Sequence, residues 1–316
     1  MTDIDPYRLG DGMAALKPKD KEPNSIRVLN SWIAHAEQAL GDPDSGRISW
    51  LIATTVVAAK LQQVVDEQRS SRFLLKGGTM LQHRLGLAAR ATKDLDAIVR
   101  GDILDFLSEM DKVLTIPWGP ISFKRGEIEE IRTPARIIKP RRFDITLTLR
   151  DKTWRRVRVE ISPDEGLAGS SLEPFPAPSL AGFGIPTPDS LMGLTMSYQI
   201  AQKIHASSDP HKPPTFVNER ARDVVDLILL HGLAEETGEP GSASIRSAIE
   251  DIFTSRAAEA KSLKRPERLW PARVSALSHW VDDYKSAAED ASVSLSLEEA
   301  VTAVNQWLDA IDASTS

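Results

Sequence analysis

Three stretches in the first third of the chain repeat apolar residues at the spacing of an amphipathic helix. They cover residues 26–40, 48–65 and 101–114, and in each of them apolar positions recur every three or four residues. Between the second and third stretches the pattern shortens. Residues 73–76 (FLLK) and 94–99 (DLDAIV) are typical of short buried strands. A mixed α and β domain is therefore expected in this part of the chain.

A β-hairpin is predicted next. Residues 142–149 and 154–161 alternate apolar and polar side chains, which is the period of strands with one buried face. A three-residue turn over 151–153 would join them and bring their apolar faces together. That register places Asp144 directly opposite Glu160 on the polar face.

The second half of the chain is dominated by helical periodicity. Residues 166–188 are rich in Pro, Gly and Ser, which indicates an interdomain linker. The helices predicted after this linker cover residues 189–206, 217–232, 243–262, 271–288 and 295–313. The chain thus divides into a loose N-terminal arm (1–24), an α/β domain with two leading helices (25–165), the linker, and a helical domain (189–316).

Composition narrows the class of protein. The 316 residues are 41% hydrophobic and 27% charged, which excludes disordered and collagen-like classes. The absence of Cys excludes disulfide scaffolds, thiol nucleophiles and Cys-ligated metals, and the six histidines have no zinc-site spacing. The N-terminal residues mix both charge signs, and no window reaches about 18 uninterrupted apolar residues. We therefore expect no signal peptide, no membrane span and a cytoplasmic location.

The formal net charge of −6 hides local basic stretches. Residues 124–158 contain twelve basic and five acidic side chains, a net charge of +7, and residues 256–273 contain six basic and two acidic ones. A basic stretch of this size can hold phosphates even on an acidic protein. The alternative is a solvated hairpin without a partner.

The segment KGGTM (76–80) has the pattern of a phosphate-binding turn. A strand that ends at Gly77 and Gly78, with Thr79 opening a short helix, exposes backbone N–H groups at a helix N-terminus. Taken alone, two glycines before a helix more often serve packing.

The segment TKDLDA (92–97) adds two carboxylates. Asp94 and Asp96 are two residues apart on a predicted strand, so both point to the same face and can share a divalent cation. Oxygen ligands completed by substrate phosphates suit Mg²⁺, or Mn²⁺ as an alternative. An exposed strand end is the alternative for the pair, but a phosphate turn so close to it favours phosphoryl or nucleotidyl transfer.

The two segments resemble the signature of the DNA polymerase β-like nucleotidyltransferase superfamily, a GG or GS turn followed by DxD. More closely, the chain resembles the AbiEii/MenT group of nucleotidyltransferase toxins from type IV toxin–antitoxin systems. Residues 140–162 are similar to the group's third-carboxylate strand, QIAQKIHA (199–206) to its lysine motif, and NERARDVVDL (218–227) to its last motif. The resemblance covers about residues 70–232 and implies a nucleotidyltransferase domain with a mixed sheet, followed by a helical C-terminal domain.

The resemblance also implies roles for individual carboxylates. Asp94, Asp96 and Glu160 would hold the metal. Asp144, opposite Glu160 in the predicted register, could share that role. The alternative for Asp144 and Glu160 is an ion-paired hairpin with the arginines of the same face.

The nucleotide would be bound, by the same resemblance, by Lys76, Gly77, Gly78, Thr79 and Lys203. Asp223 would hold or orient Lys203 or the nucleotide, and Asp226 is the alternate. Arg220 and Arg222 are candidate phosphate contacts, although the same spacing also forms ion-pair ladders on exposed helices. The implied catalytic set is Asp94, Asp96, Glu160, Lys203 and Asp223.

The function implied by the resemblance is a Mg²⁺-dependent toxin that transfers NMP from an NTP, a pyrimidine in the relatives, to the 3′ end of tRNA. Blocked aminoacylation and growth arrest would follow, restrained by a cognate antitoxin, and we expect a monomer. The basic residues 124–158 would then contact the tRNA backbone. The alternatives are a toxin that modifies a protein hydroxyl and a non-catalytic module that binds RNA or nucleotides.

Overall fold

The computed structural model describes residues 9–41, 46–86 and 89–314. Within them an eight-stranded mixed sheet forms the centre, with strand order β3-β5-β6-β2-β1-β8-β7 and with β4 paired to β5. The strands are β1 (Phe73–Leu75), β2 (Asp94–Val99), β3 (Ile121–Arg125), β4 (Glu129–Glu130), β5 (Arg141–Leu149), β6 (Lys152–Pro163), β7 (Leu172–Phe175) and β8 (Leu191–Leu194). β2 pairs with β6 and β1 with β8 in parallel, whereas the other pairs are antiparallel. The predicted fold class, α/β with a mixed sheet and a helical C-terminal part, is confirmed.

Helices cover both faces of this sheet. Those before the hairpin are α1 (Leu9–Ala14), α2 (Ile26–Ala39), α3 (Arg47–Leu61), α4 (Gly77–Leu85) and α5 (Ile103–Leu114). Those after it are α6 (Met196–Ser207), α7 (Ala221–Thr237), α8 (Ser242–Ser262), α9 (Val281–Asp290) and α10 (Leu297–Ala313). Across the described residues, none of these helices combines the length and apolar character that crossing a membrane requires.

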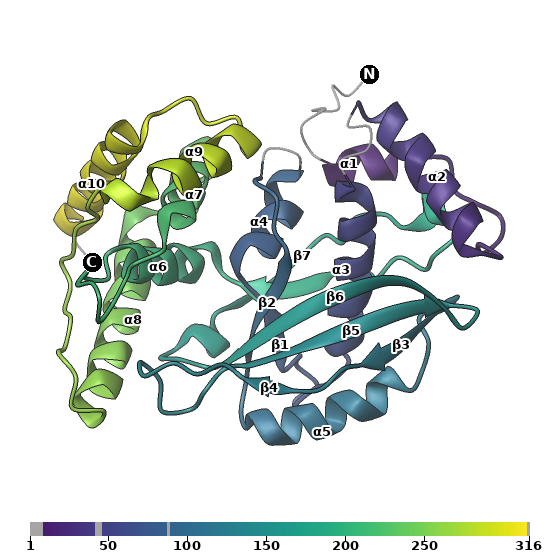
Figure 1. Ribbon diagram of the computed structural model, residues 1–316, viewed down its shortest axis with the longest axis horizontal. Helices are drawn as coiled ribbons and strands as arrows, with labels where there is room; N and C mark the ends of the chain where they lie inside the picture. Colours follow the sequence, from purple (N-terminus) through teal and green to yellow (C-terminus); the bar gives the residue numbers. More distant parts are fainter. Residues whose placement is uncertain (1–8, 42–45, 87–88, 315–316) are drawn as a thin grey trace.

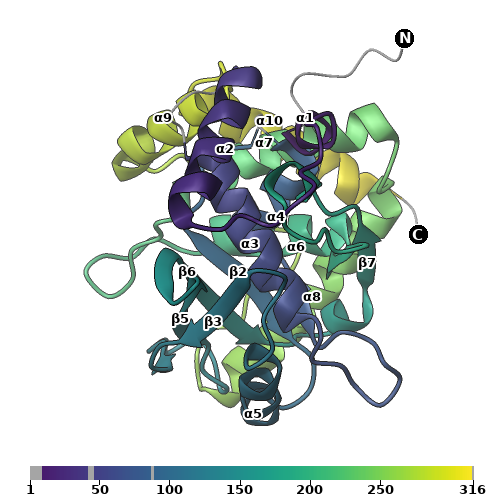
Figure 2. The ribbon, with the colours of Figure 1, turned by 90° about the vertical axis from the view of Figure 1, so that its right-hand side faces the viewer.

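Alternation along the strands divides the hydrophobic core in two. Leu95 and Ala97 of β2 and Val159 of β6 are fully buried on the face that α3 and α5 cover. Leu74 of β1 and Ile98 of β2 are buried on the opposite face, in a core built mainly by α6–α10. Figure 1 shows α6–α10 on the left, α5 below the sheet, and α4 between the helical segment and α3. In Figure 2, α3 runs from α2 at the top towards α5 at the bottom.

The part predicted as a linker contributes to the sheet. β7 lies inside residues 166–188, and β8 follows where a helix from residue 189 was expected. The four-residue apolar run of β8 is too short for periodicity to distinguish helix from strand. Its central Gly193 packs so closely that an added Cβ would lie 2.5 Å from Met80 Cε. β8 joins the sheet because it fits against β1 and α4.

Part of the predicted N-terminal arm is also packed. Residues 1–8 lie outside the described residues, but Met13 on α1 is fully buried. Further along, the Lys19 N–H donates to the Ala181 carbonyl at 2.9 Å. The described part of this segment is therefore folded onto the residues around 181, which a pattern of polar and proline residues alone does not reveal.

β5 and β6 form the predicted hairpin, but the predicted register was wrong by two residues. Asp144 lies opposite Arg158 instead of Glu160, and Glu160 lies opposite Arg142. The carboxylate of Asp144 is 3.7 Å from Arg158 Nε. Asp144 thus has the ion-paired arrangement that was the alternative to a shared metal site.

The turn explains the error. It has two residues, Arg150 and Asp151, with φ of 48° and 63°, the left-handed values that a two-residue hairpin turn of type I′ requires. The strands themselves contain an irregularity, since Leu147 pairs with Arg155 but Thr148 pairs with Thr153. β6 thus has one extra residue at this point, and this residue brings the apolar faces together.

Candidate functional site

The turn between β1 and α4 is built by glycine. Gly77 has a φ of +65°, a left-handed value that side chains disfavour, and an added Cβ would lie 2.6 Å from Asp96 Oδ2. Gly78 approaches Thr92 in the same way, since an added Cβ would lie 3.1 Å from its Oγ1. Lys76, the N-cap residue of α4, forms no side-chain capping bond. The first N–H groups of α4 thus have the arrangement that binds anions.

Thr79 stabilises this turn from inside. Its side chain is fully buried, and its hydroxyl donates to the Asp94 carbonyl at 2.7 Å. The Lys76 N–H donates to the Asp96 carbonyl at 3.0 Å. These two bonds fix the start of α4 against β2, so Thr79 positions the turn through its side chain.

The predicted carboxylates meet on one face of the sheet. Asp96 on β2 is the parallel register partner of Glu160 on β6, and Asp94 is the partner of Arg158. Glu160 accepts a hydrogen bond from Arg142 Nε at 2.7 Å. The structure therefore brings Asp94, Asp96 and Glu160 together and adds an arginine that engages Glu160.

The electrostatic environment disfavours charge on the two aspartates. Burial raises the pKa of Asp96 to about 6, opposed by the Lys76 ammonium and assisted by the carboxylates of Glu160 and Asp94. Burial, followed by the Glu160 carboxylate, also raises the pKa of Asp94, while Arg158 lowers it. A cation bound between the two aspartates would relieve this repulsion.

In the part of the chain that the structure describes, no group of three or more His, Asp or Glu side chains is placed to hold a metal ion. The predicted third carboxylate, Glu160, forms an ion pair with Arg142 at 2.6 Å. Asp94 and Asp96 remain, and Mg²⁺ in nucleotide sites is commonly held by one or two carboxylates together with substrate phosphates. The donor set fits Mg²⁺ in that arrangement.

Lys203 lies in a buried ion-pair network. Its Nζ is 2.9 Å from Asp223 Oδ1 and 2.5 Å from Asp226 Oδ2, and Asp226 also accepts two bonds of 2.8 Å from Arg90. Burial alone would lower the pKa of Lys203, but Asp223 and Asp226 outweigh it and raise that pKa above its ordinary value. Lys203 is therefore charged, with both predicted aspartates as its partners.

We expect Lys203→Met to destabilise the fold by about 3–5 kcal/mol, because the change removes the ion-pair partner of the buried Asp223 and one of the two partners of Asp226. The free energy of unfolding in urea measures this. Lys60→Met is the matched control, since Lys60 is also buried (1% exposed, against 7% for Lys203) but its Nζ donates to the neutral Gln63. Equal urea midpoints for the Lys203 variant and the wild type would contradict the prediction.

A cavity of about 230 Å³ joins these elements. Its walls are Lys76, Gly77, Gly78, Arg90, Asp96, Gln199, Gln202, Lys203, Ala206, Arg220, Asp223 and Arg256. Five of these side chains are basic and two are acidic, which suits a polyanionic ligand. Arg220, a candidate phosphate contact in the sequence, lines this cavity, whereas Arg222 is an exposed residue of α7 that is not among the lining residues.

A larger cavity of about 740 Å³ lies at the other end of α4. It is lined by residues such as Phe175, Pro176 and Met196, and its Arg84 is paired with Glu173. The predicted carboxylates and Lys203 line the smaller cavity or lie beside it. We therefore take the smaller, charged cavity as the candidate site despite its size.

The sequence analysis did not predict a role at this site for Arg90, Arg256 or Glu165, which lie at or beside the cavity. Arg90 pairs with Asp226 across 136 positions, and Arg256 pairs with Glu165 across 91 positions. Such pairs leave no local pattern in a single sequence. The basic stretch 256–273 was noticed, but as a surface and not as part of this site.

The chain matches a known protein family over most of its length. A family model described as nucleotidyl transferase AbiEii toxin of type IV toxin–antitoxin systems matches residues 60–310. Among solved structures, the chain is similar to the nucleotidyltransferase toxin MenT4 from Mycobacterium tuberculosis H37Rv. The identity is 17%, the match covers 91% of this chain and 99% of that chain, and the TM-score is 0.43. No curated protein matches the chain.

Proposed function

The chain belongs to the AbiEii family of nucleotidyltransferase toxins of type IV toxin–antitoxin systems, and on this premise we propose that it transfers a nucleoside monophosphate from an NTP to the 3′ end of tRNA. A pyrimidine NTP is the proposed donor. The modified tRNA would no longer accept an amino acid, so translation would stop. The family implies a cognate antitoxin as partner. The tRNA substrate implies action in the cytoplasm, and we propose that the protein acts as a monomer.

The charged cavity carries this proposal. Its lining combines the start of α4, which has no side-chain cap, with the side chains of Asp96, Lys203 and Arg220. Backbone N–H groups and basic side chains are the groups that bind a triphosphate. The carboxylates at the same cavity are the groups that bind the metal of a nucleotide complex.

The reaction follows from this arrangement. The N–H groups at Gly77 and Gly78 and the basic walls bind the triphosphate and hold its α-phosphorus near Asp94 and Asp96. These two aspartates would hold Mg²⁺, which supplies Lewis-acid stabilisation of the charge on the transferred phosphate. The 3′-hydroxyl oxygen of the acceptor attacks the α-phosphorus and loses its proton to solvent. The bond from that phosphorus to the bridging oxygen breaks, and pyrophosphate leaves.

The polar face of the hairpin is the proposed tRNA surface. Arg158 is the register partner of Asp94, and the side chains of Arg156 and Arg158 are 69% and 53% exposed. Arg155 lies on the other face, where it donates to Ser49 and is therefore not available to RNA. An RNA backbone on this face would lead directly to the carboxylates.

Reversing both exposed charges, Arg156→Glu with Arg158→Glu, should weaken tRNA binding and lower its salt dependence. Each lost phosphate contact changes the slope of log K against log salt by roughly 0.7–0.9. A salt titration of tRNA binding measures the slope. The matched control is Lys261→Glu with Lys264→Glu, two exposed residues of the second basic stretch. If only this control pair changes the slope, RNA docks there and the hairpin assignment fails.

A labelling experiment tests the function directly. The protein is incubated with each α-labelled NTP and Mg²⁺, together with either total tRNA or a protein extract. We expect label in the tRNA fraction, strongest with a pyrimidine NTP, and its removal by cleavage at the 3′ end. Label confined to protein would favour a protein hydroxyl as acceptor. No label in either fraction with any NTP would leave the proposed activity without support.

A further inference from the structure

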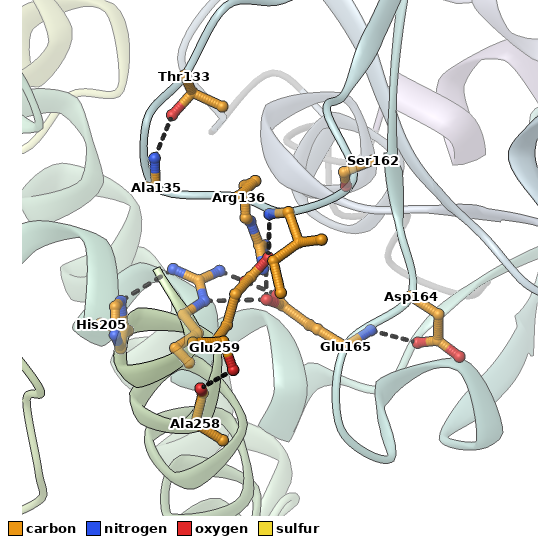
Figure 3. Close-up of polar contacts among 12 residues, drawn as sticks. Thr133, Ala135, Arg136, Ser162, Asp164, Glu165, His205, Ala258 and Glu259 are labelled. Atoms are coloured by element: carbon orange, nitrogen blue, oxygen red, sulfur yellow. Dashed lines mark hydrogen bonds and ion pairs between the residues drawn. The ribbon is translucent and has the colours of Figure 1, made fainter. Parts of the chain in front are cut away.

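Charged and polar side chains gather around the buried Glu165, where α6 and α8 meet the end of β6. We call this group the Glu165 cluster, and its members are Arg136, Glu165, Gln202, Arg256 and Glu259. Glu165 follows β6 and is only 5% exposed. Figure 3 shows Arg136, Glu165 and Glu259 converging, with His205 at the edge of the group. The cluster thus connects β6, the loop between β4 and β5, α6 and α8.

Each oxygen of Glu165 accepts two hydrogen bonds. Oε1 accepts from Arg256 Nη2 at 2.9 Å and from Gln202 Nε2 at 2.7 Å. Oε2 accepts from Arg256 Nε at 2.9 Å and from Arg136 Nη2 at 2.6 Å. Burial would raise the pKa of Glu165, but Arg256 and Arg136 outweigh it and hold that pKa well below its usual range. Glu165 is therefore a fixed anion between two arginines.

The Lys76 ammonium adds positive charge beside the cluster. It is bonded to Ser162 at 2.7 Å and acts electrostatically on both Glu165 and Asp96. Burial lowers the pKa of Lys76, and the positive charges of Arg136 and Arg256 lower it further, against the opposing effect of Glu165 and Asp96. An anion in the neighbouring cavity would add negative charge close to these cations.

Arg256 is the cluster's arginine that lines the cavity, beside Lys76, Gly77 and Asp96. Its Nε and Nη2 donate to Glu165, and its Nη1 is 2.8 Å from His205 Nδ1. A guanidinium carries five N–H donors. Further donors on Nη1 and Nη2 are therefore left for a ligand, and the plane of the guanidinium is fixed on three of its atoms.

We propose that Arg256 binds a phosphate group of the donor nucleotide and that Glu165 is the positioning residue that orients its guanidinium toward the cavity. This inference rests on the proposed function, because it takes the ligand to be a nucleoside triphosphate. A planar fork suits phosphate oxygens, and a side chain already fixed loses little freedom when the ligand binds. Arg256 of α8 thereby adds a binding group to a site whose proposed metal ligands, Asp94 and Asp96, come from the sheet.

If the Glu165 cluster had a purely structural role, its variants would behave differently. The cluster also ties the loop between β4 and β5 to α8, through Arg136 Nη1 to Glu259 at 2.9 Å and the Ile137 N–H to Glu259 at 2.7 Å. If the cluster served only to join these elements, loss of Glu259 would resemble loss of Arg256. Glu259→Gln is therefore the matched control, since it breaks contacts of the cluster without touching Arg256.

Calorimetry with inorganic tripolyphosphate on the full-length protein tests the inference without requiring catalysis. Arg256→Gln should weaken the affinity about tenfold or more, as expected for loss of a charge-assisted hydrogen bond. Arg256→Lys keeps the charge without the fork and should lie between this variant and the wild type. Glu165→Gln should also weaken the affinity, and in transfer assays it should raise KM for NTP more than it lowers kcat. Glu259→Gln should bind as the wild type does.

Each outcome separates the two proposals. If the wild type does not bind tripolyphosphate, or if the Arg256 variants bind it as tightly as the wild type, the inference is overturned even when the wild type transfers nucleotides. Equal losses of affinity in Glu259→Gln and Arg256→Gln would also overturn it and assign the cluster a structural role. A third outcome is that tripolyphosphate affinity depends on Arg256 but the wild type labels neither RNA nor protein. This outcome would support the phosphate site and refute the proposed function.

Discussion

Replacing Asp96 by asparagine is expected to reduce nucleotide transfer by roughly a thousandfold. The carboxylate lies at the cavity, next to the turn of Gly77 and in register with Glu160. Metal-assisted stabilisation of a phosphoryl transition state is worth several kcal/mol, and each 1.36 kcal/mol is about a factor of ten in rate. Asparagine removes a half-buried carboxylate whose charge is disfavoured by desolvation and by two neighbouring carboxylates, with Lys76 as the opposing charge. The melting temperature should therefore not fall.

Transfer of label to tRNA, together with a thermal melt of the same sample, measures both parts of this prediction. Asp111→Asn is a suitable control, because Asp111 forms an ion pair with Arg125 on the surface. We expect the control to retain full transfer. A folded Asp96→Asn protein that transfers nucleotide at the wild-type rate would remove Asp96 from the mechanism and, with it, the metal site.

Gly77→Ala should lower transfer by about a hundredfold or more. A left-handed φ of +65° costs a residue with a side chain roughly 1–2 kcal/mol. In addition, the new Cβ would lie 2.6 Å from Oδ2 and 3.0 Å from Cβ of Asp96, so Asp96 must move. A displacement of about 1 Å at a reacting centre can cost about a hundredfold in rate.

Gly238→Ala separates strain from displacement. Gly238 has a similar φ of +72° at the end of α7, and an added Cβ would meet no described heavy atom within 4 Å. Both variants should therefore lose stability in urea through the left-handed φ, with a further loss in Gly77→Ala from the contact with Asp96, whereas only Gly77→Ala should lose transfer. A Gly77→Ala protein with normal transfer would mean that the turn tolerates a side chain beside Asp96.

The parts of the fold that sequence predicted are those set by local periodicity. β2 has the predicted bounds of residues 94–99, and α2, α5 and α10 start within two residues of expectation. The register of the hairpin was wrong because a left-handed turn at Arg150 and Asp151, neither of them glycine, has no clear sequence signal. α9 starts at Val281, ten residues later than expected, after a segment that includes Pro271.

The candidate site, like the fold, was predicted from the sequence only in part. Short motifs located the turn at Gly77 and the carboxylates of Asp94 and Asp96, and the resemblance added Lys203 with its partner Asp223. The structure brings Gly77, Asp96, Lys203 and Asp223 to one cavity. The contributions of Arg90 and Arg256 depend on tertiary pairing, which a single sequence does not encode locally.

The position of β8 has a consequence for how such a gene can evolve. β8 is encoded after the predicted linker, yet it lies between β1 and β7 and pairs in parallel with β1 at Leu75, two residues before Gly77. A gene fragment that ended at residue 188 would leave β1 with an unpaired edge, which invites association with other chains. Recombination at the linker would therefore disturb the turn at Gly77 and make the protein encoded by the first fragment less soluble. We therefore expect the two halves to be inherited as one unit, even though their sequence patterns resemble separable modules.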